Sequence, residues 1–384
     1  MTEPIVIIGG GMTAGNATVE LRESGYDGEL VVFAGESHPP YERPPLSKDY
    51  LGGRAEAEDA YLKPAEWYGE HDVDLRTGTP VESIHLDDHV VATADGRQPY
   101  SRLLIATGAQ PRTLPLASTD ELEVAYLRSL DSARHLRERI VDGTRLLVVG
   151  GGWIGMEVAA TARGLGAEVT LVEPAEQPLL KALGPELGQR LADVHRKHGV
   201  DLRTSTSVEK LQGRRAVLDD GSELEIDLVL VGIGAAPDDG LARSAGIDVD
   251  NGILVDAGLR TSHPDVFAAG DVANHAHPLL KERVRVEHWQ NAVSQGKAVA
   301  HALLGEDVSF DELPSFFSDQ YDLGLEYFGH PGAAGSDSVR IEPGSSGDDS
   351  LVAWWHRGDT LVAAMHINEW DRSKELAERV RQGS

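Results

Sequence analysis

The 384-residue sequence contains no cysteine. The chain therefore has no disulfide, no thiolate nucleophile and no cysteine ligand for a metal ion. This absence excludes enzymes that relay electrons through a pair of protein thiols, and peroxidases that depend on a reactive cysteine. Any electrons that this protein transfers must leave without passing through a protein sulfur.

Basic residues are also scarce: 35 Lys and Arg stand against 63 Asp and Glu, a formal net charge of −28. A chain this acidic repels phosphate backbones, so we expect no nucleic-acid partner. No apolar run reaches the roughly 18 residues that span a bilayer, and the sequence starts without a secretory signal pattern. We therefore expect a cytoplasmic protein with no membrane partner. The spacing of His275 and His277 matches no known zinc pattern, which predicts no metal site.

Two glycine-rich loops lie roughly 140 residues apart. Residues 9–14 follow the apolar run 5–8, and residues 150–155 follow the apolar run 146–149. A Gly-x-Gly-x-x-Gly/Ala turn brings backbone N–H groups and a helix N-terminus onto a pyrophosphate. Two such loops predict two separate dinucleotides, with a ligand-free glycine-rich turn as the alternative for the first loop.

The first loop fits this pattern with one substitution. Gly9 allows the tight turn, Gly11 lets the backbone approach the phosphates, and Ala14 supplies the small third residue. Glu36 follows the next predicted strand, residues 30–34, at a position where a carboxylate accepts the hydroxyls of a ribose.

The second loop has all three glycines: Gly150, Gly152 and Gly155. Glu173 ends the following strand, and its carboxylate would repel the additional phosphate of NADP. The next three residues include no arginine to hold that phosphate. We therefore predict NADH rather than NADPH, with a solvated strand end as the alternative role for Glu173.

The order of elements predicts one unit inserted into another. Strands at 5–8, 30–34 and 103–106 with a helix at 14–24 form the first unit, and the chain returns to apolar sequence at 252–270. Between them lie a strand at 146–149, a helix at 153–165 and a strand at 168–172. The last seventy or so residues alternate as antiparallel strands do and end in a helix at 371–382. Trp354 and Trp355 are adjacent, so in a strand they face opposite ways.

These and further motifs resemble the FAD-dependent NADH:ferredoxin/rubredoxin reductases of bacterial oxygenase systems, the putidaredoxin reductase-like family. The motifs that carry the resemblance are the two glycine loops and the segments 43–48, 106–112, 269–271, 287–292 and 316–321. The resemblance covers nearly the whole chain. Phe317 departs from it, because a tryptophan is common there.

The resemblance implies an α/β fold of the glutathione-reductase type, without its redox disulfide. Two Rossmann-like dinucleotide-binding domains and a C-terminal α+β domain are expected. The expected FAD-binding domain comprises residues 1–111 and 240–312, the NADH-binding domain residues 112–239, and the C-terminal domain residues 313–384. We expect a monomer or a homodimer.

The resemblance also assigns roles to matching positions, and it implies no metal. The residues implied to contact FAD are Gly9, Gly11, Thr13, Ala14, Glu36, Arg43, Lys48, Val81, Thr107, Gly108, Arg128, Asp271 and Trp289. The residues implied to contact NADH are Gly150, Gly152, Ile154, Gly155, Glu157, Glu173 and Gly234. Lys48 and Glu157 are implied to lie together where the nicotinamide meets the flavin, as the catalytic pair. A helix that starts near Asn291 would point its positive end at the reduced flavin.

Each member of that pair has an ordinary alternative role. Lys48 follows a proline turn and could be a surface residue. Glu157 falls in the predicted first helical turn after the glycine loop, where the helix dipole stabilises a carboxylate in any case.

The implied activity is that of an FAD-containing NADH-dependent reductase that passes single electrons to a ferredoxin or rubredoxin. Two alternatives stay open: a reductase of small acceptors such as quinones, dyes or radicals, and a redox-responsive interaction protein similar to apoptosis-inducing factors. Ferredoxins are typically acidic, so docking one needs a local basic patch. The candidates are Lys281, Arg283 and Arg285, or Arg372, Lys374, Arg379 and Arg381.

Overall fold

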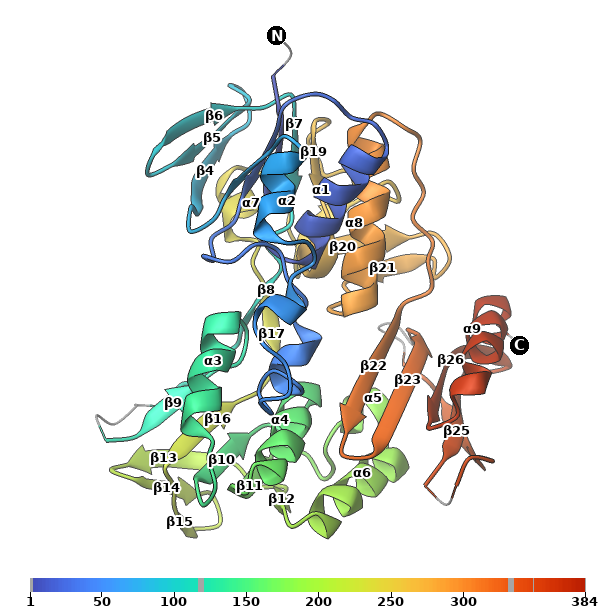
Figure 1. Ribbon diagram of the computed structural model, residues 1–384. Coiled ribbons are helices and arrows are strands. Elements are labelled where there is room, and N and C mark those ends of the chain that lie inside the picture. The colour runs from blue at the N-terminus through green and yellow to red at the C-terminus, as the bar shows by residue number, and fades with distance from the viewer. Residues whose placement is uncertain (1–2, 117–120, 331–334, 348, 384) are drawn as a thin grey trace.

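The computed structural model describes residues 3–116, 121–330, 335–347 and 349–383. Its ribbons form three bodies around one central region, each built on its own sheet (Figure 1). The N-terminal sheet lies at the top of the view, the second sheet at the lower left, and the C-terminal sheet at the right (Figure 1).

The N-terminal sheet has five parallel strands in the order β19-β7-β1-β2-β3. Its strands are β1 (Ile5–Ile8), β2 (Leu30–Phe33), β3 (Val73–Arg76), β7 (Arg102–Ile105) and β19 (Val266–Ala268). Helices α1 (Met12–Glu23) and α8 (Trp289–Leu303) pack against each other beside it. The chain leaves this sheet after β7 and returns to it at β19, with the second sheet built from the residues between.

Smaller elements complete this first body. They are η1 (Pro44–Ser47), η2 (Glu58–Ala60), α2 (Ala65–Glu70), the antiparallel sheet of β4 (Val81–His85), β5 (Val90–Thr93) and β6 (Gly96–Pro99), helix α7 (Gly240–Ser244), η3 (Gly270–Val272), and the sheet of β18 (Ile253–Val255), β20 (Ala273–His277) and β21 (Glu282–Val284). The two-stranded sheet of β8 (Ala109–Pro111) and β17 (Ala235–Pro237) connects the first body to the second.

The second sheet is also parallel, in the order β12-β11-β10-β16-β9. Its strands are β9 (Glu123–Ala125), β10 (Arg145–Val149), β11 (Glu168–Glu173), β12 (Asp201–Thr204) and β16 (Leu228–Val231). Its helices are α3 (Leu130–Arg139), α4 (Trp153–Gly164), α5 (Leu180–Leu183) and α6 (Pro185–Lys197), and a small sheet of β13 (Val208–Gln212), β14 (Arg215–Leu218) and β15 (Glu223–Glu225) lies beside it.

The C-terminal sheet is antiparallel, in the order β22-β23-β26-β25-β24. Its strands are β22 (Ser315–Gln320), β23 (Leu323–Gly329), β24 (Ser338–Pro343), β25 (Leu351–Arg357) and β26 (Thr360–Ile367), followed by η4 (Trp370–Arg372) and α9 (Ser373–Gln382). Trp355 packs into the core shared with the second sheet, whereas Trp354 packs with Leu376 and Val380 of α9. The two tryptophans therefore face opposite ways, as predicted, and both are core residues.

The predicted fold class is confirmed, and the expected elements lie within two residues of their expected ends. The topology agrees with an inserted unit. The domain boundaries at 111/112, 239/240 and 312/313 stay predictions.

Candidate dinucleotide and redox site

The first glycine loop connects β1 to α1. Gly9 has φ +141°, and a Cβ added there would lie 2.2 Å from the carbonyl oxygen of Ala106, so only glycine allows this close approach. A Cβ added at Gly11, by contrast, would meet nothing within 4 Å. Gly11 begins a helix that has no side-chain cap and no acidic residue in its first turn. Its first N–H groups therefore have no acceptor from a cap side chain or from an acidic residue of the first turn, as an anion site requires. Thr13 and Ala14, in the first turn, are buried.

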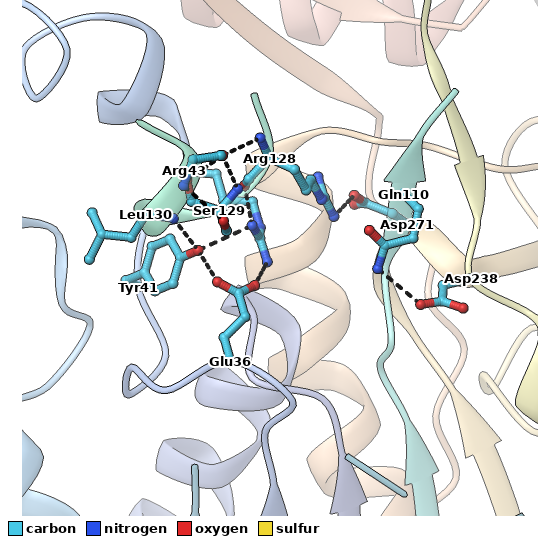
Figure 2. Close-up of polar contacts among 10 residues, drawn as sticks. Glu36, Tyr41, Arg43, Gln110, Arg128, Ser129, Leu130, Asp238 and Asp271 are labelled. Atoms are coloured by element: carbon cyan, nitrogen blue, oxygen red, sulfur yellow. Dashed lines mark hydrogen bonds and ion pairs between the residues drawn. The ribbon is translucent and has the colours of Figure 1, made fainter. Parts of the chain in front are cut away.

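A compact cluster of charged side chains forms near the end of β2 (Figure 2). Glu36 pairs with the Arg43 guanidinium at 2.9 Å, and its other oxygen accepts a hydrogen bond from the Tyr41 hydroxyl at 2.5 Å. Burial raises the pKa of Tyr41, so its hydroxyl stays protonated and continues to donate. The carboxylate predicted to hold a ribose is thus fixed from two sides.

Arg43 and Arg128 extend this cluster toward η3 (Figure 2). Arg43 donates to the backbone oxygen of Arg128, and the Arg128 guanidinium lies 3.3 Å from the Asp271 carboxylate. Burial raises the pKa of Asp271, with the charge of Arg128 opposing that rise. Burial, and then the charge of Arg43, lower the pKa of Arg128. Arg43 and Arg128 are half-buried cations side by side, each already facing one carboxylate, and such a pair of guanidiniums suits a pyrophosphate.

Three more predicted FAD contacts lie around this cluster. Gly108 has φ +74°, and a Cβ there would lie 3.0 Å from the Arg128 guanidinium. The Thr107 hydroxyl donates to the backbone oxygen of Asp238 at 2.7 Å, and Gln110 donates to the Asp238 carboxylate (Figure 2). Val81 begins β4, three residues after Gly78, whose N–H donates to the backbone oxygen of Glu36.

The second glycine loop connects β10 to α4. At two of its three glycines, close backbone contacts leave no room for a side chain. A Cβ at Gly150 would lie 2.5 Å from the Gly232 oxygen, and one at Gly155 would lie 2.1 Å from the Gly150 oxygen. A Cβ at Gly152 would have a single neighbour, at 3.8 Å. As at Gly11, the helix that follows has no side-chain cap and no acidic residue in its first turn. Both loops are therefore open at the glycine that should approach the phosphates.

Glu173 lies at the end of β11 and is bound to the glycine loop itself. Its carboxylate accepts hydrogen bonds from the backbone N–H groups of Gly151 at 2.7 Å and Ala175 at 2.8 Å. It is therefore an ordered part of the loop rather than a solvated strand end. Ile154, at the start of α4, is 44% exposed, and Gly234 (φ +96°) follows the segment that touches Gly150.

Lys48 and Glu157 are in direct contact, although they are far apart in the sequence. The Lys48 ammonium lies 2.7 Å from Glu157 Oε2, and the two side chains are 14% and 5% exposed. Lys48 is therefore not a surface lysine. Glu157 is the fifth residue of α4, so the expectation that it lies in the first helical turn is wrong. Lys48, rather than the helix dipole, balances its charge.

Aromatic side chains border this pair. The Lys48 ammonium lies 5.8 Å from the centroid of the Phe317 ring, which is 6.3 Å from the Trp289 ring in an edge-to-face arrangement. Trp289 is the first residue of α8, two residues before the predicted start near Asn291. Trp289 Nε1 and the neighbouring His288 Nδ1 are buried and have no hydrogen-bond partner among the described residues. Unpartnered buried nitrogens at a helix N-terminus fit a bound group with acceptor atoms.

Sequence reasoning missed four residues of this region: Tyr41, Ser47, Ser318 and Gln320. Tyr41 lies five residues from Glu36 and two from Arg43, so that local grouping was a usable signal. Ser318 is 161 residues from Glu157, and no local pattern connects them.

Among the described residues no cluster of three or more His, Cys, Asp or Glu side chains could hold a metal ion. In the same part of the chain no helix is long and apolar enough to cross a membrane. A cavity of about 400 Å³ lies between α6 and the C-terminal sheet, but neither glycine loop lines it.

Two family models and several known proteins match this chain. The family model described as pyridine nucleotide-disulphide oxidoreductase matches residues 3–296, and the reductase C-terminal model matches residues 315–380. The chain is 39% identical over 364 residues to the anthranilate 1,2-dioxygenase system ferredoxin–NAD(+) reductase component of Burkholderia cepacia, which covers 91% of this chain and 90% of the relative.

Two further relatives extend over nearly the whole chain. Putidaredoxin reductase of Pseudomonas putida is 36% identical over 386 residues, covering 97% of this chain and 91% of that protein. The crystal structure of the covalent putidaredoxin reductase–putidaredoxin complex matches with a TM-score of 0.92 at 35% identity, covering 98% of this chain and 91% of that one.

Proposed function

Because the chain belongs to the pyridine nucleotide-disulphide oxidoreductase family, we propose that it is an NADH-dependent reductase that delivers single electrons to a ferredoxin or rubredoxin of an oxygenase system. Members of this family use FAD and NAD(H), and the relatives named above are reductases of this kind. The observation that carries the proposal is the buried Lys48–Glu157 pair beside two open phosphate loops, in a chain without cysteine.

The chemistry that bound FAD would supply is uptake of a hydride from NADH and release of its two electrons one at a time to the acceptor protein, with loss of the proton. The side chains of this chain position and shield that exchange. Gly11 and the start of α1 would hold the FAD pyrophosphate, and the fixed carboxylate of Glu36 its ribose. Gly152 and Glu173 would do the same for NADH.

Lys48 and Glu157 would lie where the two ring systems meet. Each neutralises the other, so the buried site holds no unpaired charge. Trp289 and Phe317 would cover this region with apolar surface and exclude water from it.

The predicted basic patches bear on how an acceptor docks. Arg283 donates to the backbone oxygens of Val255 and Asn274, and Arg285 to that of Asp271, so both guanidiniums already hold backbone acceptors, although Arg283 stays exposed. The cations of η4 and α9 face carboxylates: Arg372 and Arg379 lie near Glu375, and Arg381 near Asp311. An acidic acceptor would have to compete with these internal partners, which makes docking sensitive to ionic strength.

The test is anaerobic addition of NADH to the purified protein, followed by visible spectroscopy. We expect a flavin spectrum that bleaches with NADH, and rapid cytochrome c reduction that depends on an added two-iron ferredoxin or rubredoxin. A slow reaction that leaves a long-lived charge-transfer band would instead support a redox-responsive interaction protein. Fast turnover with quinones or dyes but not with iron–sulfur proteins would support a small-acceptor reductase. A colourless protein that does not bind added FAD would refute all three.

We also propose that the protein works in the cytoplasm, where NADH is regenerated. Cell fractionation with an antibody to this chain would test this.

A further inference from the structure

The Glu157 carboxylate receives hydrogen bonds on both of its oxygens, from different parts of the molecule. Oε2 faces Ser47, whose hydroxyl lies 2.5 Å away, and the Lys48 ammonium. Oε1 accepts a hydrogen bond of 2.7 Å from Ser318 on β22 of the C-terminal sheet. Glu157 itself belongs to α4 beside the second sheet, and β22 packs against that helix. Three separate bodies therefore meet at one carboxylate.

The bond from Ser318 continues inward as a chain. Gln320 Nε2 lies 3.2 Å from Ser318 Oγ, and Gln320 Oε1 lies 2.9 Å from His195 Nε2 on α6. These three side chains are at most 2% exposed. Ser318 and Gln320 point the same way because they are two residues apart on one strand.

The donor and the acceptor of each hydrogen bond in this series follow from the Glu157 carboxylate at its end. An ionised carboxylate only accepts, so Ser318 donates to Glu157, and the serine oxygen accepts from the amide nitrogen of Gln320. The amide oxygen of Gln320 then accepts from His195, which fixes the Nε2–H tautomer. His195 Nδ1 is left to accept from the Tyr321 hydroxyl, 3.3 Å away. Burial lowers the pKa of His195 to about 4, so the ring stays neutral.

We propose that Ser318, Gln320 and His195 are positioning residues that hold Glu157 Oε1, so that Oε2 stays directed at Lys48. This inference rests on the proposed function, because the Lys48–Glu157 pair is assigned to the junction of nicotinamide and flavin. The terminal torsion of a glutamate is broad and roughly two-fold. A donor on Oε1 selects one orientation of the carboxylate, and aligned hydrogen bonds strengthen one another in a buried site.

The effect of losing these hydrogen bonds differs according to whether they only stabilise the fold or also orient Glu157. If the bonds only join α6 to β22, losing Ser318 should lower stability equally whether or not residue 157 is charged. If they act through Glu157, their effect on hydride transfer should disappear once Glu157 is replaced. A double-mutant cycle separates these cases.

The experiment measures anaerobic flavin reduction by NADH in the FAD-loaded protein, in a stopped-flow instrument. Ser318→Ala should lower the limiting rate about tenfold, since misplacing a group by about 1 Å can cost up to ~100-fold. The dissociation constant for NADH should change less than about twofold, because the phosphate loop and Glu173 are untouched. Ser318→Thr keeps the hydroxyl and should retain most of the rate. Gln320→Met keeps the size of the side chain and should resemble Ser318→Ala, which covers the case of a poorly folded alanine variant.

The matched control is Ser373→Ala. Ser373 of α9 also donates to a carboxylate, that of Glu326 on β23, but this bond stays within the C-terminal body and does not involve Glu157. It should leave the rate of flavin reduction unchanged. In the Glu157→Gln background, Ser318→Ala should cause no further loss of rate. Wild-type rates in both Ser318→Ala and Gln320→Met, or an equal loss in both backgrounds, would overturn the proposal.

A readout that needs no turnover separates this inference from the proposed function. With ¹⁵N-labelled histidine, the His195 ring should show a neutral Nε2–H tautomer whose signals shift in Glu157→Gln and in Ser318→Ala, but not in Ser373→Ala. If NADH does not reduce the wild-type protein but the two variants show these shifts, the proposed function is refuted and the hydrogen-bonded series from Glu157 to His195 is supported. Signals that do not respond to Glu157→Gln would refute the chain.

Discussion

Replacing one member of the Lys48–Glu157 pair should lower the free energy of unfolding more than replacing both members together. At 2.7 Å and an effective dielectric constant of about 20, the Coulomb attraction is roughly 6 kcal/mol, much of which offsets the desolvation of two buried ions. Removing one partner leaves the other charge buried and unpaired, which typically costs about 3–5 kcal/mol.

The two single variants should lose different amounts of unfolding free energy. Lys48→Met leaves the Glu157 carboxylate with its bonds from Ser47 and Ser318, so we expect about 3 kcal/mol of lost unfolding free energy. Glu157→Gln removes the negative charge 2.7 Å from the ammonium, whose other hydrogen bonds are long, at 3.3 Å to the Pro44 oxygen and 3.4 Å to the Ser47 hydroxyl. We expect about 4–5 kcal/mol there. The double variant buries no charge and should be less destabilised than either.

Urea unfolding followed by circular dichroism gives this order, and stopped-flow reduction by NADH gives the consequence for hydride transfer. Both single variants should slow flavin reduction or loosen FAD. Additive losses of stability in the double variant would refute the claim that the two charges compensate each other. A Lys48→Met protein with full FAD occupancy and an unchanged reduction rate would remove Lys48 from the mechanism.

Three further predictions follow from the geometry. Gly9→Ala should lower the yield of folded protein because its Cβ would meet Ala106 at 2.2 Å, whereas Gly11→Val should leave the apoprotein folded and lower FAD occupancy, measured by the ratio of visible to ultraviolet absorbance. Glu173→Ala should lower the ratio of kcat/KM for NADH over NADPH about tenfold, with Glu173→Gln as the control that retains an acceptor for the loop; a wild-type preference for NADPH would refute this role. The unfolding free energy should fall as the pH drops from about 6.5 toward 4. His195 has a pKa of about 4 in the folded protein, below its value in the unfolded chain, so the unfolded state binds more protons in that window. The stability that this neutral histidine contributes above about pH 6.5 is therefore lost on acidification. His195→Gln should reduce this slope by up to about 1.4 kcal/mol per pH unit, and an equal slope in variant and wild type would contradict the burial argument.

What the sequence could predict is what local chemistry determines. The glycine loops are recognisable because a tight turn, an approach to phosphate and a helix start each need a particular residue at a fixed spacing. Glu36 and Glu173 follow from the strands that precede them. The contact of Lys48 with Glu157 is different: it was expected from a resemblance alone, because nothing near either residue specifies the other.

The contacts that join the bodies could not be predicted in this way. Ser318 and Glu157 are brought together by the packing of β22 on α4. Segment 316–321 contributes to the family resemblance, but nothing in it specifies Glu157 as the partner of Ser318. The same reason explains why Arg283 and Arg285 were read as candidates for a docking patch. Their role as donors to backbone oxygens in distant segments is visible only once those segments are folded together.

Strand β22 shows how the C-terminal body contributes to the redox site. Its side chains alternate, so that Ser318 and Gln320 are buried toward Glu157 and His195 while Phe317, 37% exposed, covers Lys48. Pairing with β23, where Ser318 lies opposite Leu325, sets this register. A slip of one residue would exchange the two faces and place either the Phe317 ring or the Asp319 carboxylate against the Glu157 carboxylate. The register of β22 therefore determines both the hydrogen bond on Oε1 and the apolar cover of the ion pair, which makes the C-terminal sheet part of the site rather than a separate cap.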